Sequence, residues 1–189
     1  MRAKKKKVNP VRKFKIIQKK VIFPKWPVYL ADYKIAMPNG RILSRQIIEP
    51  PGAAVIIPKM GKDRYLLIKQ FRFAARSWLW EWPAGGLEDG ESIRQTAARE
   101  LSEETGYYPR KLKKIASFYP TPGISSEIMH LFLAEDMIPR KGEQDEDEEI
   151  EVHVFSLAQI GKMIRTERIC DGKTILGFFY LKNFYRMKP

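Results

Sequence analysis

Apolar and polar residues along the chain form two kinds of pattern, short apolar runs and one longer periodic stretch. The short runs are rich in β-branched and aromatic residues, which favour strands. They predict strands at 15–23, 28–36, 41–48, 53–58, 64–71, 113–119, 128–134 and 150–155. Pro38-Asn39-Gly40 predicts a turn before the third strand, and Gly61-Lys62-Asp63 predicts a hairpin between the fourth and fifth. The chain therefore begins with a small antiparallel sheet.

The periodic stretch predicts a helix with sequence signals at both ends. Ser92 and Gln95, three residues apart, form a capping box, and Gly106 is a stop signal. Ile93 and Leu101 recur on one side of this helix, so that side is expected to face the core. Two further helices are predicted at 156–165 and 172–185, the second apolar enough to be largely buried.

Charge is distributed unevenly along the chain. The formal net charge is +13, yet ten of the Lys and Arg residues fall in the first twenty positions, and 143–151 is almost wholly acidic. We interpret 1–14 as a basic flexible tail. Such a tail either binds nucleic acid or another anionic surface through counterion release, or it is only a solvated feature.

Composition limits the class of protein. The 189 residues suit one domain with a small appended element. The lone cysteine, Cys170, excludes an internal disulfide framework, and no apolar run is long enough to cross a bilayer. We therefore expect a soluble, cytoplasmic protein. The Pro-rich stretch at 49–52 predicts a boundary between a small sheet at 15–49 and a main domain at 50–189.

Carboxylates gather on the predicted helix that ends at Gly106. Glu100, Glu103 and Glu104 are spaced i, i+3 and i+4, so all three project from one strip of the helix surface. Such a strip is either a solvated acidic face or a set of ligands for a hard divalent cation, which takes oxygen ligands and shares them with substrate phosphates. The spacing alone leaves both interpretations open.

The residues around these carboxylates resemble the Nudix box, the pattern G-x5-E-x7-R-E-U-x-E-E-x-G-U, in which U is a bulky apolar residue. Every fixed position is matched, by Gly85, Glu91, Arg99, Glu100, Glu103, Glu104 and Gly106. Tyr107 occupies the last U position, where an aliphatic residue is more usual. The resemblance implies an α/β fold, an α/β/α sandwich around a mixed sheet. It also implies a metal-dependent hydrolase of nucleoside diphosphates linked to another group.

Two further segments resemble the ADP-ribose pyrophosphatase branch of the Nudix enzymes. Residues 81–85, EWPAG, are similar to the lead-in E-x-P-A-G, and Pro122 lies sixteen residues after Gly106 at the start of a PG-x-S-x-E run. The resemblance implies that the carbonyl of Ala84 is a metal ligand. It also implies hydrolysis of ADP-ribose or related ADP-sugars to AMP and a sugar phosphate, with Mg²⁺ or Mn²⁺ as cofactor.

The same resemblance implies roles for single residues. The implied metal ligands are Ala84, Glu100, Glu103 and Glu104. The implied structural residues of the motif are Gly85, Glu91, Arg99 and Gly106. In the family a mobile acidic loop supplies a catalytic glutamate, and alignment on I-x-V-H-V favours Glu146, with Glu148 second and Glu103 a further catalytic candidate.

Substrate binding is expected from two parts of the chain. Arg72 follows a core strand and precedes the glycine-rich segment, so it either clamps a phosphate or is an ordinary surface arginine. In relatives the N-terminal sheet reaches across a homodimer, and the resemblance implies the same here. The candidate substrate-binding residues are Arg72, Arg45, Trp26, Tyr29, Tyr33, Pro122 and Gly123.

Two alternative functions stay open. One keeps the hydrolase and changes its substrate to a GDP-sugar, a dinucleoside polyphosphate or capped RNA; the basic tail favours capped RNA, whereas Pro122 argues against it. The other is a non-catalytic nucleotide sensor or RNA-binding module built on the Nudix fold. A complete set of mutually repelling glutamates argues against that reading, because a binder has no need of them.

Overall fold

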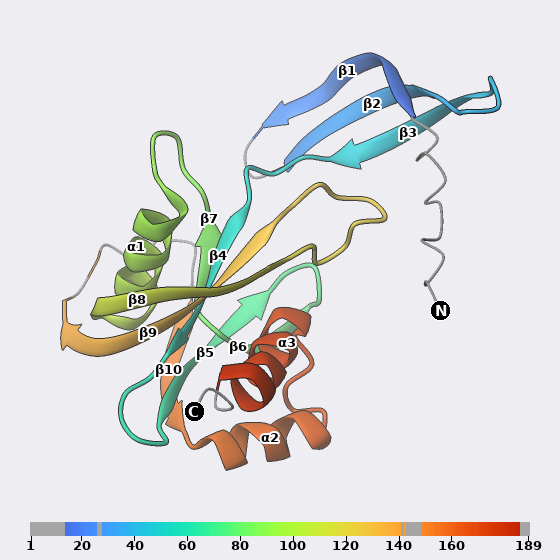
Figure 1. The fold of residues 1–189 in the computed structure, drawn as a ribbon. Helices are drawn as coiled ribbons and strands as arrows, with labels where there is room; N and C mark the ends of the chain where they lie inside the picture. The colour runs from blue at the N-terminus through green and yellow to red at the C-terminus, as the bar shows by residue number, and fades with distance from the viewer. Residues whose placement is uncertain (1–13, 26–27, 141, 143–148, 186–189) are drawn as a thin grey trace, which may run out of the picture. The chain divides into compact units, whose positions relative to one another are not determined.

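A computed structural model describes residues 14–25, 28–140, 142 and 149–185 of the chain (Figure 1). The chain divides into two compact units, one holding the residues up to Pro50 with Gly123–Ser126, and the other holding Pro51–Pro122 with the residues from Glu127 onward. Trp26, Glu146, Glu148 and nearly all of the predicted basic tail lie outside the described residues. No helix in the described ranges is long and apolar enough to cross a membrane.

The first unit is a three-stranded antiparallel sheet. Its strands are β1 (Lys15–Lys25), β2 (Val28–Ala36) and β3 (Ile42–Ile48), in that order. The predicted turn between β2 and β3 is confirmed, with Gly40 at a φ of 83° that favours glycine. The returning segment 123–126 joins this sheet, because the N–H of Ser126 and the carbonyl of Ile124 both bond to Ile48 at 2.9 Å. Local sequence gave no signal for that addition.

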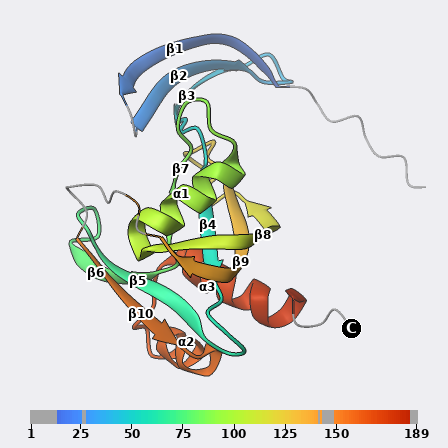
Figure 2. The same cartoon turned by 90° about the vertical axis from the view of Figure 1, so that its left-hand side faces the viewer.

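The second unit contains two sheets (Figures 1 and 2). The larger sheet has the order β7 (Ala84–Gly86), β4 (Ala53–Pro58), β9 (Met129–Pro139) and β8 (Tyr107–Phe118). It is mixed, because β4 pairs with β9 in parallel and the other pairs are antiparallel. The smaller, antiparallel sheet has the order β10 (Ile150–Phe155), β5 (Tyr65–Arg72) and β6 (Ser77–Glu81).

Helices cover both faces of the larger sheet, and the alternation along β4 explains why. The helices are α1 (Ile93–Thr105), α2 (Leu157–Arg165) and α3 (Gly172–Tyr180), the last followed by a π-helical turn η1 (Leu181–Tyr185). Ala54 and Ile56 pack with Leu101 of α1, whereas Val55 and Ile57 pack into a cluster that includes residues of α2 and α3. Both faces of β4 are buried, which confirms the predicted sandwich around a mixed sheet.

One prediction about strand pairing is wrong. The strands β4 and β5 do not form a hairpin, because β4 pairs with β7 and β9 while β5 pairs with β10 and β6. The two segments are joined by an isolated bridge between Lys59 and Tyr65 and by a hydrogen bond from the Met60 N–H to the Arg64 carbonyl at 2.8 Å. The turn at 60–64 instead carries the chain from one sheet to the other. The predicted helix at 172–185 is also divided, since regular α-helix ends at Tyr180.

Candidate active site

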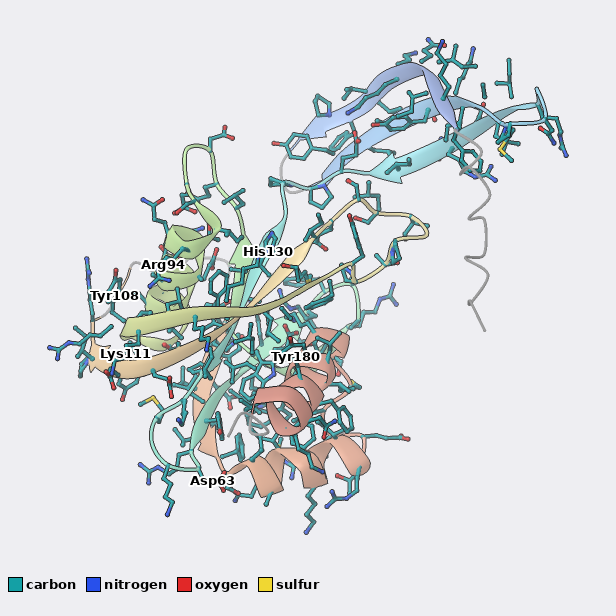
Figure 3. All side chains as sticks on the ribbon, viewed as in Figure 1. Asp63, Arg94, Tyr108, Lys111, His130 and Tyr180 are labelled. Atoms are coloured by element: carbon teal, nitrogen blue, oxygen red, sulfur yellow. The ribbon has the colours of Figure 1, made fainter. Side chains whose placement is uncertain are left out.

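The helix α1 begins and ends where local chemistry dictates. The Ser92 side chain accepts from the N–H of Gln95, and the Gln95 side chain accepts from the N–H of Ser92 at 2.9 Å, so the predicted capping box is confirmed. At the other end Gly106 adopts a left-handed φ of 74° and donates its N–H to Ser102. Arg94 further ties α1 to β8 by donating to the carbonyl of Leu112 at 2.7 Å (Figure 3). The carboxylates of α1 therefore stand on a fixed frame.

Arg99 lies among four carboxylates, three of which are fixed positions of the motif. Its Nε lies 2.9 Å from Glu91, and its Nη1 lies 2.9 Å from Glu100 and 2.8 Å from Glu103. Glu88 is a longer partner at 3.5 Å. Burial by itself would lower the pKa of Arg99, but the surrounding carboxylates raise it. The hydrogen bond from Arg99 in turn lowers the pKa of Glu91. One cation thus offsets the repulsion between acidic side chains that the spacing predicts.

Arg99 also fixes the glycine-rich segment, and two glutamates lie directly against it. Nη2 of Arg99 donates to the carbonyl of Gly86 at 3.1 Å. The N–H of Ala84 donates to Oε2 of Glu104 at 3.0 Å, and Glu104 is only 4% exposed. A Cβ built on Gly85 would lie 2.0 Å from the Glu100 carboxyl group. The absence of a side chain at Gly85 is therefore what lets Glu100 reach the backbone of β7.

This arrangement fits a magnesium or manganese ion in its donor chemistry. Mg²⁺ is usually held by one or two carboxylates together with substrate phosphates and water. Within the described part of the chain, no group of three or more His, Cys, Asp and Glu side chains is gathered as a metal cage. Glu100 and Glu104 lie against β7, whose main-chain carbonyls are further oxygen donors of this type. The donors present are therefore of the kind that a hard divalent cation prefers.

Glu103 faces the point at which the acidic segment begins. Gly142 donates its N–H to the Ser102 carbonyl at 3.2 Å, and a Cβ built on Gly142 would lie 2.8 Å from Cγ of Glu103. The Ser102 hydroxyl also donates to the carbonyl of Arg140 at 2.7 Å. A hollow of about 440 Å³ lies here, lined in part by Arg99 and Glu103. The chain thus enters the stretch that carries Glu146 and Glu148 beside the carboxylate helix.

Arg72 is held by a carboxylate that the sequence did not assign to the site. Its Nε and Nη2 donate to Glu81 at 2.9 and 2.7 Å in a bidentate pair, and Glu81 is 1% exposed. Lys173 donates to the same carboxylate. Burial by itself would raise the pKa of Glu81, but the hydrogen bonds from Arg72 and the charge of Lys173 lower it. No local pattern links Lys173 to Glu81, which lies 92 positions earlier.

The remaining predicted substrate residues are distributed over both units. In the first unit Tyr33 is 7% exposed, its hydroxyl donates to Glu49, and the Lys19 ammonium lies 5.6 Å from its ring centre. Tyr29 is half-buried, whereas the cross-strand neighbour of Tyr33, Arg45, is exposed. Gly123 is exposed in the first unit and Pro122 is exposed in the second.

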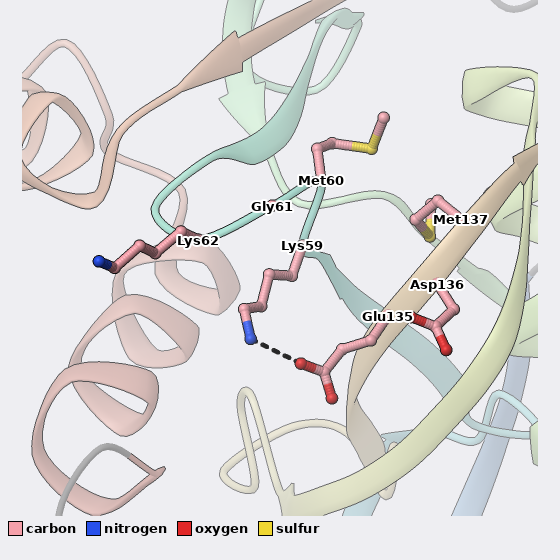
Figure 4. Close-up of a pocket in the computed structure, with 7 residues that line it drawn as sticks. All are labelled: Lys59, Met60, Gly61, Lys62, Glu135, Asp136 and Met137. Carbon is pink, nitrogen blue, oxygen red and sulfur yellow. Dashed lines mark hydrogen bonds and ion pairs between the residues drawn. The ribbon is translucent and has the colours of Figure 1, made fainter.

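A separate hollow of about 380 Å³ lies at the turn after β4 (Figure 4). The turn 59–62 and residues 135–137 of β9 line it, and an ion pair between Lys59 and Glu135 at 2.6 Å crosses it. None of the predicted site residues belongs to its lining. This hollow is therefore separate from the carboxylates of α1.

Comparison with known proteins gives consistent matches. A model of the NUDIX domain matches residues 49–176. The ADP-ribose pyrophosphatase of Bacillus subtilis (strain 168) is 39% identical over 170 residues, which are 89% of this chain and 92% of that protein. The methanol dehydrogenase activator of Bacillus methanolicus is 34% identical with the same coverage. A crystal structure of an ADP compounds hydrolase has a TM-score of 0.82 at 20% identity and covers 95% of this chain and 97% of that one, which shows a shared fold.

Proposed function

Because the chain belongs to the NUDIX family, we propose that it hydrolyses the pyrophosphate bond of ADP-ribose or a related ADP-sugar, giving AMP and a sugar phosphate. The observation that carries the proposal is the position of Glu100 and Glu104 against the glycine-rich strand β7, with Arg99 fixing both elements. The similarity to the Bacillus subtilis ADP-ribose pyrophosphatase supports the choice of substrate.

Different residues are proposed for metal binding, for activation of the attacking water and for support of the helix. Glu100, Glu104 and the Ala84 carbonyl would hold Mg²⁺ or Mn²⁺, with Glu103 as a further ligand, and the ion would offset pyrophosphate charge and lower the pKa of a bound water. Glu146, with Glu148 second, would orient the attacking water and accept its proton. The water oxygen forms a bond to phosphorus as the bond to the bridging oxygen breaks. Glu91 acts through Arg99 and keeps the helix and β7 in register.

Base recognition is proposed for the first unit. Tyr29 is the better stacking candidate of the two described tyrosines, since the ring of Tyr33 is buried and its hydroxyl is engaged by Glu49. Arg45 is exposed and would hydrogen-bond the adenine. Pro122 and Gly123 would limit the shape of the pocket, because a proline-containing loop is stiff. Trp26 stays a candidate on sequence grounds.

A homodimer is part of the proposal, and the surface of the first unit supports it. Several large apolar side chains of this sheet are exposed, namely Ile16, Ile17, Val21, Ile22, Phe23 and Ile42. Large apolar side chains exposed in such number favour contact with another protein surface. A second copy of the chain would bury them, so light scattering is expected to give twice the mass of one chain.

The test is release of AMP from ADP-ribose with Mg²⁺, beside GDP-mannose, diadenosine polyphosphate and capped RNA. Preferential turnover of ADP-ribose is expected, together with loss of turnover in Glu104→Gln, which keeps an acceptor for the Ala84 N–H and removes the charge. Removal of the metal by a chelator should abolish activity, and added Mg²⁺ should restore it. A folded protein that binds ADP-ribose but hydrolyses none of the four compounds would refute the enzyme assignment in favour of a sensor.

A further inference from the structure

Glu81 is a buried carboxylate shared by two cations from distant parts of the chain. It is 1% exposed, and it accepts the bidentate fork of Arg72 on β5 as well as the ammonium of Lys173 on α3. A buried carboxylate is stable in its charged form only when such partners are present. The orientation of Glu81 therefore depends on both cations, and the orientation of Arg72 depends on Glu81.

Lys173 is itself held in place by the start of α3. Asp171 caps the helix by accepting from the N–H of Thr174 at 2.9 Å, and its second oxygen accepts from Lys173 at 3.1 Å. The side chain of Lys173 is only 10% exposed. Thr174 in turn accepts from the N–H of Trp82 at 2.9 Å, next to Glu81 in sequence. The Lys173 ammonium group is thus held by Asp171 and by Glu81.

Lys173 also acts electrostatically on the loop that follows Pro122. Burial raises the pKa of Glu127, and the positive charge of Lys173 opposes that rise. Glu127 ends the PG-x-S-x-E run that begins with Pro122. Lys173 therefore acts on Glu81, the partner of Arg72, and on the end of the run that begins with Pro122, yet it carries no part of the predicted motifs.

We propose that Lys173 is a positioning residue that acts through Glu81 to aim the Arg72 guanidinium at a substrate phosphate. Without Lys173, Glu81 keeps one cation in place of two, and its carboxylate is free to turn and draw Arg72 with it. The side chain of Arg72 is 36% exposed, so its guanidinium stays accessible from solvent while Glu81 fixes its plane. This inference rests on the proposed function, because that function supplies the phosphate.

A double-mutant cycle tests the proposal. The kinetic constants kcat and KM for ADP-ribose are measured for the wild type, Lys173→Met, Arg72→Met and the double variant. Lys173→Met is expected to raise KM about tenfold with little change in kcat, the size of one lost charge-assisted hydrogen bond. Because Lys173 acts through Arg72, the double variant is expected to be no worse than Arg72→Met alone. If the double variant instead raised KM by the product of the two single-variant increases, the proposal would be overturned.

Two further variants separate positioning from a merely structural role. Lys173→Arg keeps the cation and is expected to restore KM, whereas Lys162→Met removes an exposed lysine of the neighbouring helix and should leave both constants unchanged. If thermal unfolding shows that Lys173→Met does not fold, Lys173→Gln replaces it and keeps a hydrogen-bond donor without the charge. If Lys173→Met lowered the unfolding temperature but left KM unchanged, the proposal would also be overturned.

Failure of the proposed function has a different signature. If the wild type hydrolyses no substrate, the same four proteins are titrated with ADP-ribose and with inorganic pyrophosphate by calorimetry. A dissociation constant about tenfold weaker in Lys173→Met, with no further loss in the double variant, supports the positioning role without catalysis. Equal affinities in wild type and Lys173→Met, or no binding by the wild type, overturn it.

Discussion

Substitution of Gly85 by alanine should separate activity from stability. The new Cβ would lie 2.0 Å from the Glu100 carboxyl group, whereas ordinary van der Waals contact begins at 3.4 Å. The three atoms nearest to the new Cβ all belong to the end of the flexible Glu100 side chain, so we expect Glu100 to rotate aside while α1 and β7 stay in place. The fold therefore survives, but a proposed metal ligand leaves its position.

The two effects can be worked out separately. Rotation of Glu100 breaks its 2.9 Å ion pair with Arg99, in which both side chains are mostly buried, while Arg99 keeps Glu91 and Glu103 as partners. A lost charge-assisted hydrogen bond of this kind costs about 1.5–3 kcal/mol. For a chain of this length that loss lowers the unfolding temperature by about 3–12 °C. Even groups that only support a metal ligand change affinity or activity by about 10–100-fold. We therefore expect Gly85→Ala to lose activity about 100-fold, at the upper end of that range.

The assay is ADP-ribose hydrolysis over a series of Mg²⁺ concentrations, beside thermal unfolding of the same samples. Gly61→Ala is the matched control, because a Cβ at Gly61 meets no atom within 4 Å. The control should retain both activity and the wild-type metal requirement. Wild-type activity in Gly85→Ala would refute the reasoning, as would a loss of activity that only follows unfolding.

Two further predictions concern the neighbourhood of Arg99. In Gly142→Ala the new Cβ would meet the backbone N and Cα of Glu103 at 2.9 and 3.0 Å, so the chain must shift. We expect kcat to fall about 100-fold, the lower end of the range for a lost general base. An unchanged kcat would contradict a catalytic role for the segment that Gly142 begins. The hydrogen bond from Arg99 holds the pKa of Glu91 below its ordinary value of 4.5, so Glu91 stabilises the fold above that pH and loses this contribution as the pH falls through the lowered pKa. Glu91→Gln should therefore lower the unfolding temperature at pH 7 by more than at acidic pH. Equal decreases in unfolding temperature at the two pH values would contradict a stabilising ion pair between Glu91 and Arg99.

The sequence predicts those parts of the fold that local chemistry decides. The limits of α1 follow from Ser92, Gln95 and Gly106, because a cap is made by residues within one turn of the helix. The strands at 53–58 and 150–155 are recovered with the bounds of β4 and β10, because continuous apolar or β-branched runs favour extended chain. The pairing partners of a strand cannot be predicted in this way. Nothing in a strand's own residues says which sheet it joins, and so the hairpin prediction failed.

The same limit holds for the candidate site. The motif residues from Gly85 to Gly106 lie in one continuous segment, so their spacing could be read directly. The strand β7 escaped prediction because its three residues, Ala84–Gly86, carry no apolar pattern and gain their form by pairing with β4. The partnership of Glu81 with Lys173 was missed for the same reason, since it depends on how α3 packs.

The pairing of Trp82 with α3 has a consequence for the order of folding. Trp82 donates from its N–H and from Nε1 to Thr174, 92 residues later, at 2.9 and 3.0 Å. Contacts that close so long a loop form late, because the loss of chain entropy precedes the gain in contact energy. During synthesis, α1 can form with its caps long before the C-terminal helix leaves the ribosome. The segment that leads into β7 is fixed only when that helix docks, so hydrolytic competence is expected to be among the last properties the nascent chain acquires.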